Sequence, residues 1–178
     1  MKLIKTDLAG VYLIEYNEKK DIRGSFSKIY NTNSYNEVGI QFEINEHFFS
    51  VSNYGVIRGM HFQKPPFTQE KIVYVLNGKI MDVILDLRSN SGTYGKYIVI
   101  ELSRECNKCI YIPKGLAHGF QSLENNTITI YLQSSIFNKD SDMGINPFSI
   151  DINWPILEYI ISDKDKQLPA LVDFITPF

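Results

Sequence analysis

The chain has 178 residues, of which 44% are hydrophobic and 21% are charged, and its formal net charge at pH 7 is −2. This length suits one domain with a buried core, so we interpret residues 1–178 as a single domain. The slightly acidic charge argues against binding to nucleic acid or to an anionic membrane surface. A charged N-terminus, and the lack of a run of about 20 apolar residues, indicate neither a secretory signal nor a membrane span, and we expect a cytoplasmic protein.

Short runs of β-branched and aromatic residues, separated by turn residues, recur along the chain and predict strands. They cover residues 10–15, 71–76, 79–87, 97–102, 109–112 and 127–132. Asn77 and Gly78 stand between the second and third runs, and such a pair predicts a two-residue β-hairpin. Helical patterning is weak until residues 155–159 and 163–167, which predict short helical turns. Together these signals favour an all-β sandwich or barrel.

The run 79–87 has two different faces. Its odd-numbered positions from Met81 to Leu87 are all apolar, whereas Asp82 and Asp86 stand among the even-numbered positions. Because side chains alternate along a strand, we predict that the odd-numbered face packs on the core. We interpret Asp82, Asp86 and Arg88 as a structural ion-pair or turn set and leave them outside the functional site.

Cys106 and Cys109 form a single C-x-x-C motif. A structural zinc ion needs four ligands, and no second cysteine pair or nearby histidine completes the set. The motif also lies between predicted strands rather than at a helix start, where a redox pair would gain a stabilised thiolate. We therefore expect two ordinary reduced cysteines in a connection.

Two of the three histidines lie in short motifs, His61 in RGMHFQ (58–63) and His118 in PKGLAHGF (113–120). A β-sandwich with one histidine on a central strand and a second after a P-x-G turn resembles the cupin jelly roll. The predicted fold class is therefore an all-β, cupin-type jelly-roll β-sandwich with short C-terminal helical turns. Many cupins hold a metal through H-x-H, but here Gln63 replaces the second histidine, so we expect no metal. His61 is then free to act as a base.

Further motifs recur in a fixed order from about residue 10 to residue 171. They are Asp21-x-Arg23-Gly24-x-Phe26, residues 58–63, Gln69-x-Lys71, Asp82-x-x-x-Asp86-x-Arg88, Ser91-x-x-x-Gly95, residues 113–120, Tyr131 and Ser162-x-Lys164-Asp165. This ordered set resembles the dTDP-4-dehydrorhamnose 3,5-epimerase family of nucleotide-sugar enzymes. The resemblance implies a homodimer that needs no metal or other cofactor and that acts on nucleotide-diphosphate 4-keto sugars.

The resemblance also implies a catalytic set. A C4 ketone acidifies the hydrogens at C3 and C5, but an enolate forms only if a base and positive groups are aimed at the reacting atoms. By resemblance His61 is the base, and Asp165 orients its imidazole. Lys71 and Arg58 would lie near the enolate oxygen or the diphosphate. Tyr131 would return a proton from the opposite face of the ring, which inverts the carbon.

The same resemblance gives His118 and Lys164 roles in substrate binding. The resemblance further implies that the N-terminal segment reaches across the dimer. Arg23 would then contact the nucleotide with its planar donors.

Several nucleotide-binding positions depart from the family pattern. The chain has Lys28 where the family has Glu, Glu46 and Phe48 for a Gln-x-Asn pair, Phe137 for a stacking Tyr, and Asp142 for Glu. A cation at position 28 suits the acceptors of guanine better than the N3–H of thymine. Phe137 can still stack on any base. We infer retained chemistry on an altered substrate.

Four alternatives remain open at this point. The first is a GDP-linked 4-keto-heptose epimerase of capsule biosynthesis, and the second is an epimerase that inverts only C3 or only C5. The third is a cupin 3,4-ketoisomerase, which the histidine arrangement and the chain length disfavour. The last is a non-catalytic sugar-binding cupin, which would have no need of a base and an acid on opposite faces.

Overall fold

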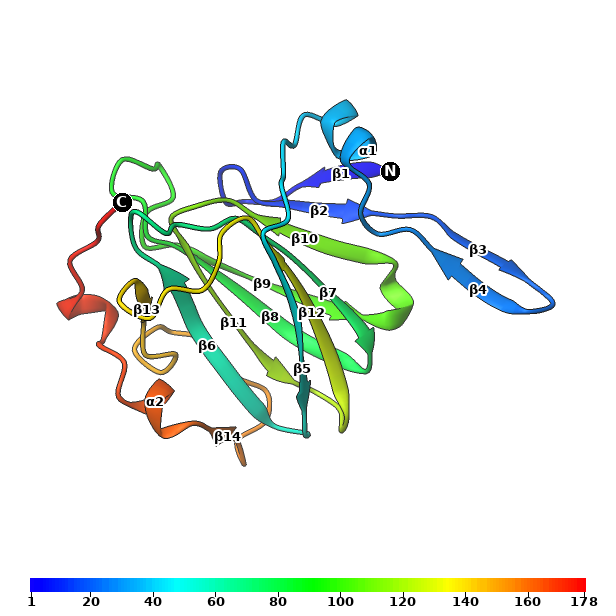
Figure 1. Cartoon of the computed structure of the whole chain (residues 1–178). Coiled ribbons are helices and arrows are strands. Elements are labelled where there is room, and N and C mark those ends of the chain that lie inside the picture. The colour runs from blue at the N-terminus through cyan, green and yellow to red at the C-terminus, as the bar shows by residue number, and fades with distance from the viewer.

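The computed structural model describes residues 1–178 and shows two facing β-sheets (Figure 1). The first sheet has the order β1 (Lys2–Lys5), β2 (Tyr12–Glu15), β10 (Lys108–Ile112), β7 (Lys71–Asn77), β12 (Thr127–Gln133) and β5 (Glu46–Ser52). The second has the order β13 (Asp142–Gly144), β6 (Val56–Gln63), β11 (Leu116–Ser122), β8 (Lys79–Asp86) and β9 (Tyr97–Ser103), with β14 (Ile160–Ile161) beside β6. The predicted all-β sandwich is confirmed.

The space between the sheets holds the central core. Both sheets contribute to one cluster of buried side chains, so their inner faces pack on each other. Its members include Val73 and Val75 of β7, Ile80 and Ile84 of β8, Ile110 of β10, Phe120 of β11 and Tyr131 of β12. Burying apolar area in this way drives the two sheets together.

The odd-numbered face of β8 packs in a hydrophobic core, as predicted, but it is not the face that meets this central cluster. Ile80 and Ile84 point between the sheets, whereas Val83 and Leu85 pack on the outside against the C-terminal third of the chain, including Trp154. Both faces of β8 are therefore buried. Alternation along a strand identifies two faces, but it does not say which one a distant segment will cover.

The predicted hairpin at Asn77 and Gly78 is wrong, because β7 and β8 belong to different sheets. β7 lies between β10 and β12, and β8 lies between β11 and β9. Gly78 has φ +77°, and a Cβ there would lie 2.5 Å from Thr127 Oγ1. The Asn-Gly pair thus makes a tight turn that carries the chain from one sheet to the other.

Helices are short. α2 (Asp163–Lys166) confirms the helical turn predicted over 163–167, and Ser162 caps it by accepting the N–H of Asp165 at 3.1 Å. Residues 155–159 form no helix. α1 (Thr32–Glu37) was not predicted, and 3₁₀ turns span Arg104–Cys106 and Leu171–Asp173. No helix is long and apolar enough to cross a membrane.

The two cysteines are free thiols in different surroundings. Cys106 lies in the 3₁₀ turn before β10, but Cys109 lies within β10 and not in a connection as predicted. Cys109 is fully buried beside the Tyr35 hydroxyl, 3.4 Å from its Sγ, and burial raises the pKa of this thiol to about 12. At neutral pH it is therefore an uncharged core residue.

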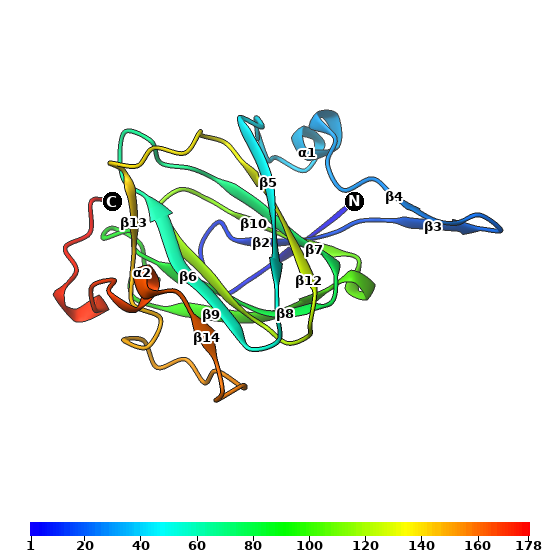
Figure 2. The same ribbon diagram turned by 60° about the horizontal axis from the view of Figure 1, so that its bottom comes forward.

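A third, two-stranded sheet stands apart from the sandwich. β3 (Glu18–Asp21) and β4 (Gly24–Ser27) form a hairpin that projects away from the body of the molecule in both views (Figures 1 and 2). Ile22 at its tip is fully exposed, and Phe26 is 62% exposed.

Candidate active site

A cavity of about 720 Å³ opens between the two sheets. Strands β5, β6, β11, β12 and β13 and helix α2 contribute to its walls. Ten of the twelve site residues predicted from the sequence line it, namely Glu46, Arg58, His61, Lys71, His118, Tyr131, Phe137, Asp142, Lys164 and Asp165. Residues distant in sequence thus meet at one concave surface.

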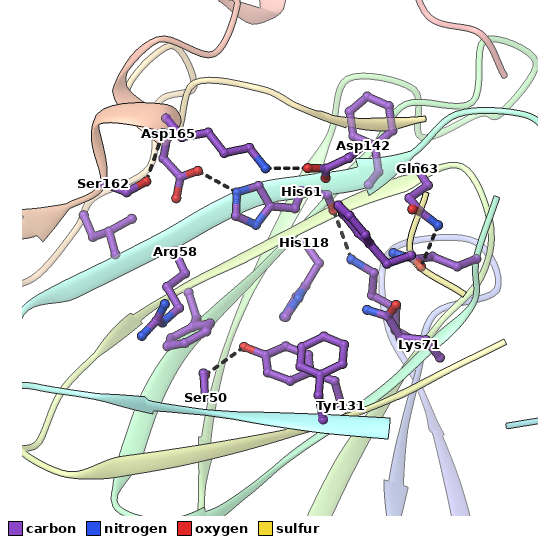
Figure 3. A pocket seen from close by; sticks show the side chains of 18 of the residues that line it. Ser50, Arg58, His61, Gln63, Lys71, His118, Tyr131, Asp142, Ser162 and Asp165 are labelled. Atoms are coloured by element: carbon purple, nitrogen blue, oxygen red, sulfur yellow. Dashed lines mark hydrogen bonds and ion pairs between the residues drawn. The ribbon is translucent and has the colours of Figure 1, made fainter. Parts of the chain in front are cut away.

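His61 and Asp165 form a hydrogen-bonded pair at this surface (Figure 3). Nε2 of His61 lies 2.7 Å from Oδ1 of Asp165, and Oδ2 of the same carboxylate accepts the N–H of Gly59 at 3.3 Å. Burial alone would raise the pKa of Asp165, but the hydrogen bonds from His61, Gly59 and Ser162 outweigh it and lower that pKa. An ionised carboxylate accepts a hydrogen bond from Nε2–H and so favours the tautomer with its proton on Nε2, which leaves Nδ1 free to act as a base.

Lys71 lies at the start of β7, beside the base. Its Nζ donates to the carbonyl of His61 at 3.1 Å, and the residue is 5% exposed. Burial lowers the pKa of Lys71 to about 8, although the negative charges of Asp142 and Asp82 oppose this effect. The cavity therefore contains a desolvated ammonium whose remaining donors are available to an anionic group.

Tyr131 stands on the opposite sheet from His61 (Figure 3). Its ring stacks on Phe48 with centroids 4.7 Å apart and an interplanar angle of 16°. Its hydroxyl lies 3.4 Å from Oγ of Ser50. Burial raises the pKa of this phenol above its usual value, so the hydroxyl is protonated at neutral pH.

His118 and Asp82 form a second histidine–carboxylate pair. His118 pairs with His61 in the register of β11 and β6, and its Nε2 lies 2.7 Å from Oδ1 of Asp82. Asp82 does not line the cavity, and its place outside the functional site stays a prediction. It pairs with His118 rather than with Arg88, and so holds the ring of a histidine that does line the cavity.

Asp86 and Arg88, by contrast, form the predicted structural pair. Nε of Arg88 donates to Oδ1 of Asp86 at 2.8 Å, and the hydroxyls of Ser91 and Thr93 donate to Oδ2 at 2.7 and 2.6 Å. This set lies at the end of β8 and in the turn after it, outside the cavity.

Gln63 has a role that sequence reasoning did not assign. Its Nε2 donates to the carbonyls of Phe67 at 2.9 Å and Ile136 at 3.0 Å, and its Oε1 accepts the N–H of Asn138 at 2.6 Å. These bonds fix the segment that carries Phe137, whose ring is 58% exposed at the cavity.

Charged groups ring the rest of the cavity. Arg58 donates from Nε to Ser52 Oγ at 3.0 Å and from Nη2 to the carbonyl of Val51 at 3.1 Å. Lys164 and Asp142 form an ion pair of 2.5 Å. Glu46 contributes a carboxylate oxygen that is buried and has no hydrogen-bond partner.

Two predicted binding residues lie elsewhere. Arg23 sits at the tip of the β3–β4 hairpin, where it pairs with Asp21 at 2.5 Å and its side chain is 85% exposed. Lys28 is exposed just after β4. One chain by itself does not bring either residue to its own cavity.

Known proteins resemble this chain over nearly its whole length. The sequence profile of dTDP-4-dehydrorhamnose 3,5-epimerase matches residues 5–173. The enzyme of that name from Methanothermobacter thermautotrophicus is 38% identical over 175 residues, which covers 96% of this chain and 94% of the relative. The cavity described above is thus built from a sequence that this family shares.

Solved structures give the same result. The dTDP-6-deoxy-D-glucose-3,5-epimerase of Legionella pneumophila, in complex with dTDP-4-keto-L-rhamnose, has a TM-score of 0.93 and 32% identity, covering 98% of this chain and 94% of that one. A 3′-monoepimerase from Streptomyces bikiniensis in complex with dTDP-quinovose has a TM-score of 0.89 and 28% identity, covering 94% and 86%. The chain therefore belongs to the dTDP-4-dehydrorhamnose 3,5-epimerase family of isomerases.

Proposed function

We propose that this protein is a single-domain epimerase that inverts C3 and C5 of a dTDP-linked 4-keto-6-deoxyhexose. The observation that carries the proposal is the placement of a base and an acid on facing sheets. His61, held by Asp165 at 2.7 Å, and Tyr131 both line the cavity between them. A sugar ring in this cavity would present opposite faces to the two groups.

The first half of the reaction is a deprotonation. Nδ1 of His61 takes a proton from the carbon beside the ketone, the C–H electron pair moves into a C=C bond, and the C4 oxygen becomes negative. Asp165 stabilises the imidazolium that results. Lys71 supplies a desolvated positive donor for the enolate oxygen, and such preorganised groups stabilise developing charge strongly.

The second half is a protonation from the other face. Tyr131 gives its hydroxyl proton to the carbon, the enolate collapses to the ketone, and the configuration is inverted. The raised pKa of Tyr131 supports this role, because the group enters the step as a neutral acid. Repeating the two halves at the other neighbour of the ketone inverts the second centre.

The known relatives favour thymidine over guanine as the base. Lys28, whose positive charge suggested guanine, directly follows the β3–β4 hairpin, so its position relative to a partner's cavity does not decide between the two bases. The similar Legionella and Streptomyces enzymes bind dTDP-linked sugars. Phe137 offers an exposed ring for stacking at the cavity rim.

A homodimer would complete the site. The β3–β4 hairpin holds Arg23 away from its own body, so this guanidinium is placed to reach only another molecule. The outer face of the edge strand β5 also exposes Phe49 by 62% and Val51 by 50%, and Leu76 of β7 is 51% exposed. We propose that a second copy covers this apolar face and receives the hairpin.

Mixing two inactive variants tests the dimer. In a hybrid of Arg23→Ala and His61→Asn chains, one site would combine intact His61 with intact Arg23 from the partner chain. Activity should reappear after the two variants are unfolded and refolded together. Hybrid dimers without activity would contradict a shared site.

Isotope exchange tests the reaction. The protein is incubated in D2O with dTDP- and GDP-linked 4-keto-6-deoxyhexoses and with a GDP-linked 4-keto heptose, and the sugars are analysed by mass spectrometry. Uptake of two deuterium atoms by the dTDP hexose supports the proposal. One deuterium would indicate a mono-epimerase, preference for the heptose would support the GDP alternative, and no uptake would favour a binding protein.

A further inference from the structure

Tyr131 must recover a proton after each step, and the structure limits how it can do so. This argument rests on the proposed function, in which the phenol gives its proton to carbon and becomes a phenolate. The residue is 7% exposed, Phe48 covers one face of its ring, and the His118 ring packs against it in a T-shaped arrangement with ring centroids 6.1 Å apart. Inverting a second centre in the same binding event needs this recovery while a sugar fills the cavity.

Ser50 is the hydrogen-bond partner of the Tyr131 hydroxyl, with Oγ and Oη 3.4 Å apart (Figure 3). This pair is longer than a typical O–H···O bond, but catalytic hydrogen bonds are often long before the substrate closes the site. Ser50 lies on the edge strand β5, lines the cavity and is only partly buried. Its hydroxyl therefore connects a buried phenol to a position that water reaches.

Arg58 fixes a positive charge on the same wall. Its two hydrogen bonds go to Val51 and Ser52, the residues that directly follow Ser50 in β5. Burial dominates and raises the pKa of Tyr131, and the negative charge of Asp82 acts in the same direction, whereas the hydrogen bond from Ser50 and the charge of Arg58 oppose them. The net effect disfavours the phenolate, so a tyrosine anion formed here is strongly basic and takes a proton back from a neighbouring donor, which is the Ser50 hydroxyl.

We propose that Ser50 is a proton relay that returns a proton to Tyr131 after each carbon protonation. The Ser50 Oγ–H bond breaks as the Tyr131 Oη–H bond re-forms, and the serine oxygen takes a proton from water in the same movement. The proton balance closes because His61 releases to solvent the proton that it removed from the sugar. Ser50 thus renews the acid between one carbon protonation and the next.

For a variant without the Ser50 hydroxyl, we predict a burst of deuterium incorporation that stops after one protonation per active site. Each protein is equilibrated in D2O, mixed rapidly with excess dTDP-4-keto-6-deoxyglucose, quenched, and analysed for deuterated, inverted product. In Ser50→Ala the first deuterium should enter at the wild-type rate, from the phenol itself. Later turnover should fall by about 10- to 100-fold, because the acid is renewed slowly.

Two further variants make the test specific. Ser50→Thr keeps a hydroxyl at this position and should restore steady turnover. Thr129→Val is the matched control, because Thr129 faces Ser50 in the strand register and its buried hydroxyl has no hydrogen-bond partner. It should behave as wild type.

The outcomes separate the relay from the proposed function. If wild-type protein incorporates no deuterium, the proposed function fails and the relay fails with it. If wild-type protein does incorporate deuterium, two results overturn the relay alone: full steady turnover in Ser50→Ala, or an equal loss in the first and later turnovers. The second result would mean that Ser50 only positions Tyr131.

Discussion

Replacing Lys71 by Met should make the protein more stable and less active. Burial lowers the pKa of Lys71 from 10.5 to about 8, and at about 1.4 kcal/mol per pH unit this corresponds to a penalty of about 3 kcal/mol for holding the ammonium at neutral pH. The variant loses the hydrogen bond to the carbonyl of His61, worth about 1 kcal/mol. Methionine fills a similar volume, so a net gain of about 2 kcal/mol is expected.

The stability difference between Lys71→Met and wild type should depend on pH. Below about pH 8 the lysine is protonated in both folded and unfolded chains, and the full penalty is present. Between about pH 8 and 10.5 the unfolded chain binds more protons, so wild-type stability rises with pH relative to the variant. Urea denaturation of both proteins should show that the variant exceeds wild type in free energy of unfolding by less at pH 10 than at pH 7.

Activity should move in the opposite direction. Removing a preorganised donor from an oxyanion typically lowers turnover by about 10²–10³-fold, and deuterium uptake by Lys71→Met should fall by that amount. A variant that is less stable than wild type at pH 7, with a gap that does not change up to pH 10, would refute the burial argument. Unchanged uptake would refute the role in enolate stabilisation.

The base, the acid, the carboxylate that holds the base and a nearby glycine each give a further expectation. His61→Asn should abolish deuterium uptake at both carbons while calorimetry shows dTDP binding close to wild type, and retained uptake would mean that another group is the base. Tyr131→Phe should lose inversion, followed by NMR, more than it loses exchange; an equal loss would argue against a separate acid. Asp165→Asn should lower kcat by about 10²–10⁴-fold with little change in KM, because the amide would donate to Nε2 and move the ring proton to Nδ1. Gly59→Ala should destabilise the fold by more than about 2 kcal/mol in urea, because Gly59 has φ +121° and its Cβ would lie 2.5 Å from Gly119 Cα; a neutral result would contradict this geometry.

The sequence predicted the kind of fold but not the pairing of its strands. The runs at 71–76, 97–102, 109–112 and 127–132 lie within observed strands, because alternation and β-branching are local signals. The turn at Asn77 and Gly78 is also local, yet whether the flanking strands pair with each other depends on β10 and β12, which come later in the chain. Local patterns therefore located the strands and misassigned their partners.

The site residues also divide into those that local motifs identified and those whose position depends on strand pairing or on a second chain. His61, Lys71, Tyr131 and Asp165 belong to short motifs, and the cavity brings all four together. Asp82 was interpreted as structural together with Asp86 and Arg88, but its observed partner is His118, 36 residues away, and only the pairing of β8 with β11 makes the two neighbours. Arg23 could not be placed in a cavity from one chain, since its hairpin points away from the sandwich.

Gln63 has a consequence for redesign of this sandwich. A histidine at this position would offer a metal-ligand nitrogen, and so would seem a simple route to a metalloenzyme. It would also leave the carbonyls of Phe67 and Ile136 and the N–H of Asn138 without the partners that the amide provides. Each lost hydrogen bond costs about 0.5–1.5 kcal/mol, so the segment after β12 would have to be rebuilt together with the ligand. The choice between amide and imidazole at residue 63 is thus also a choice of loop conformation.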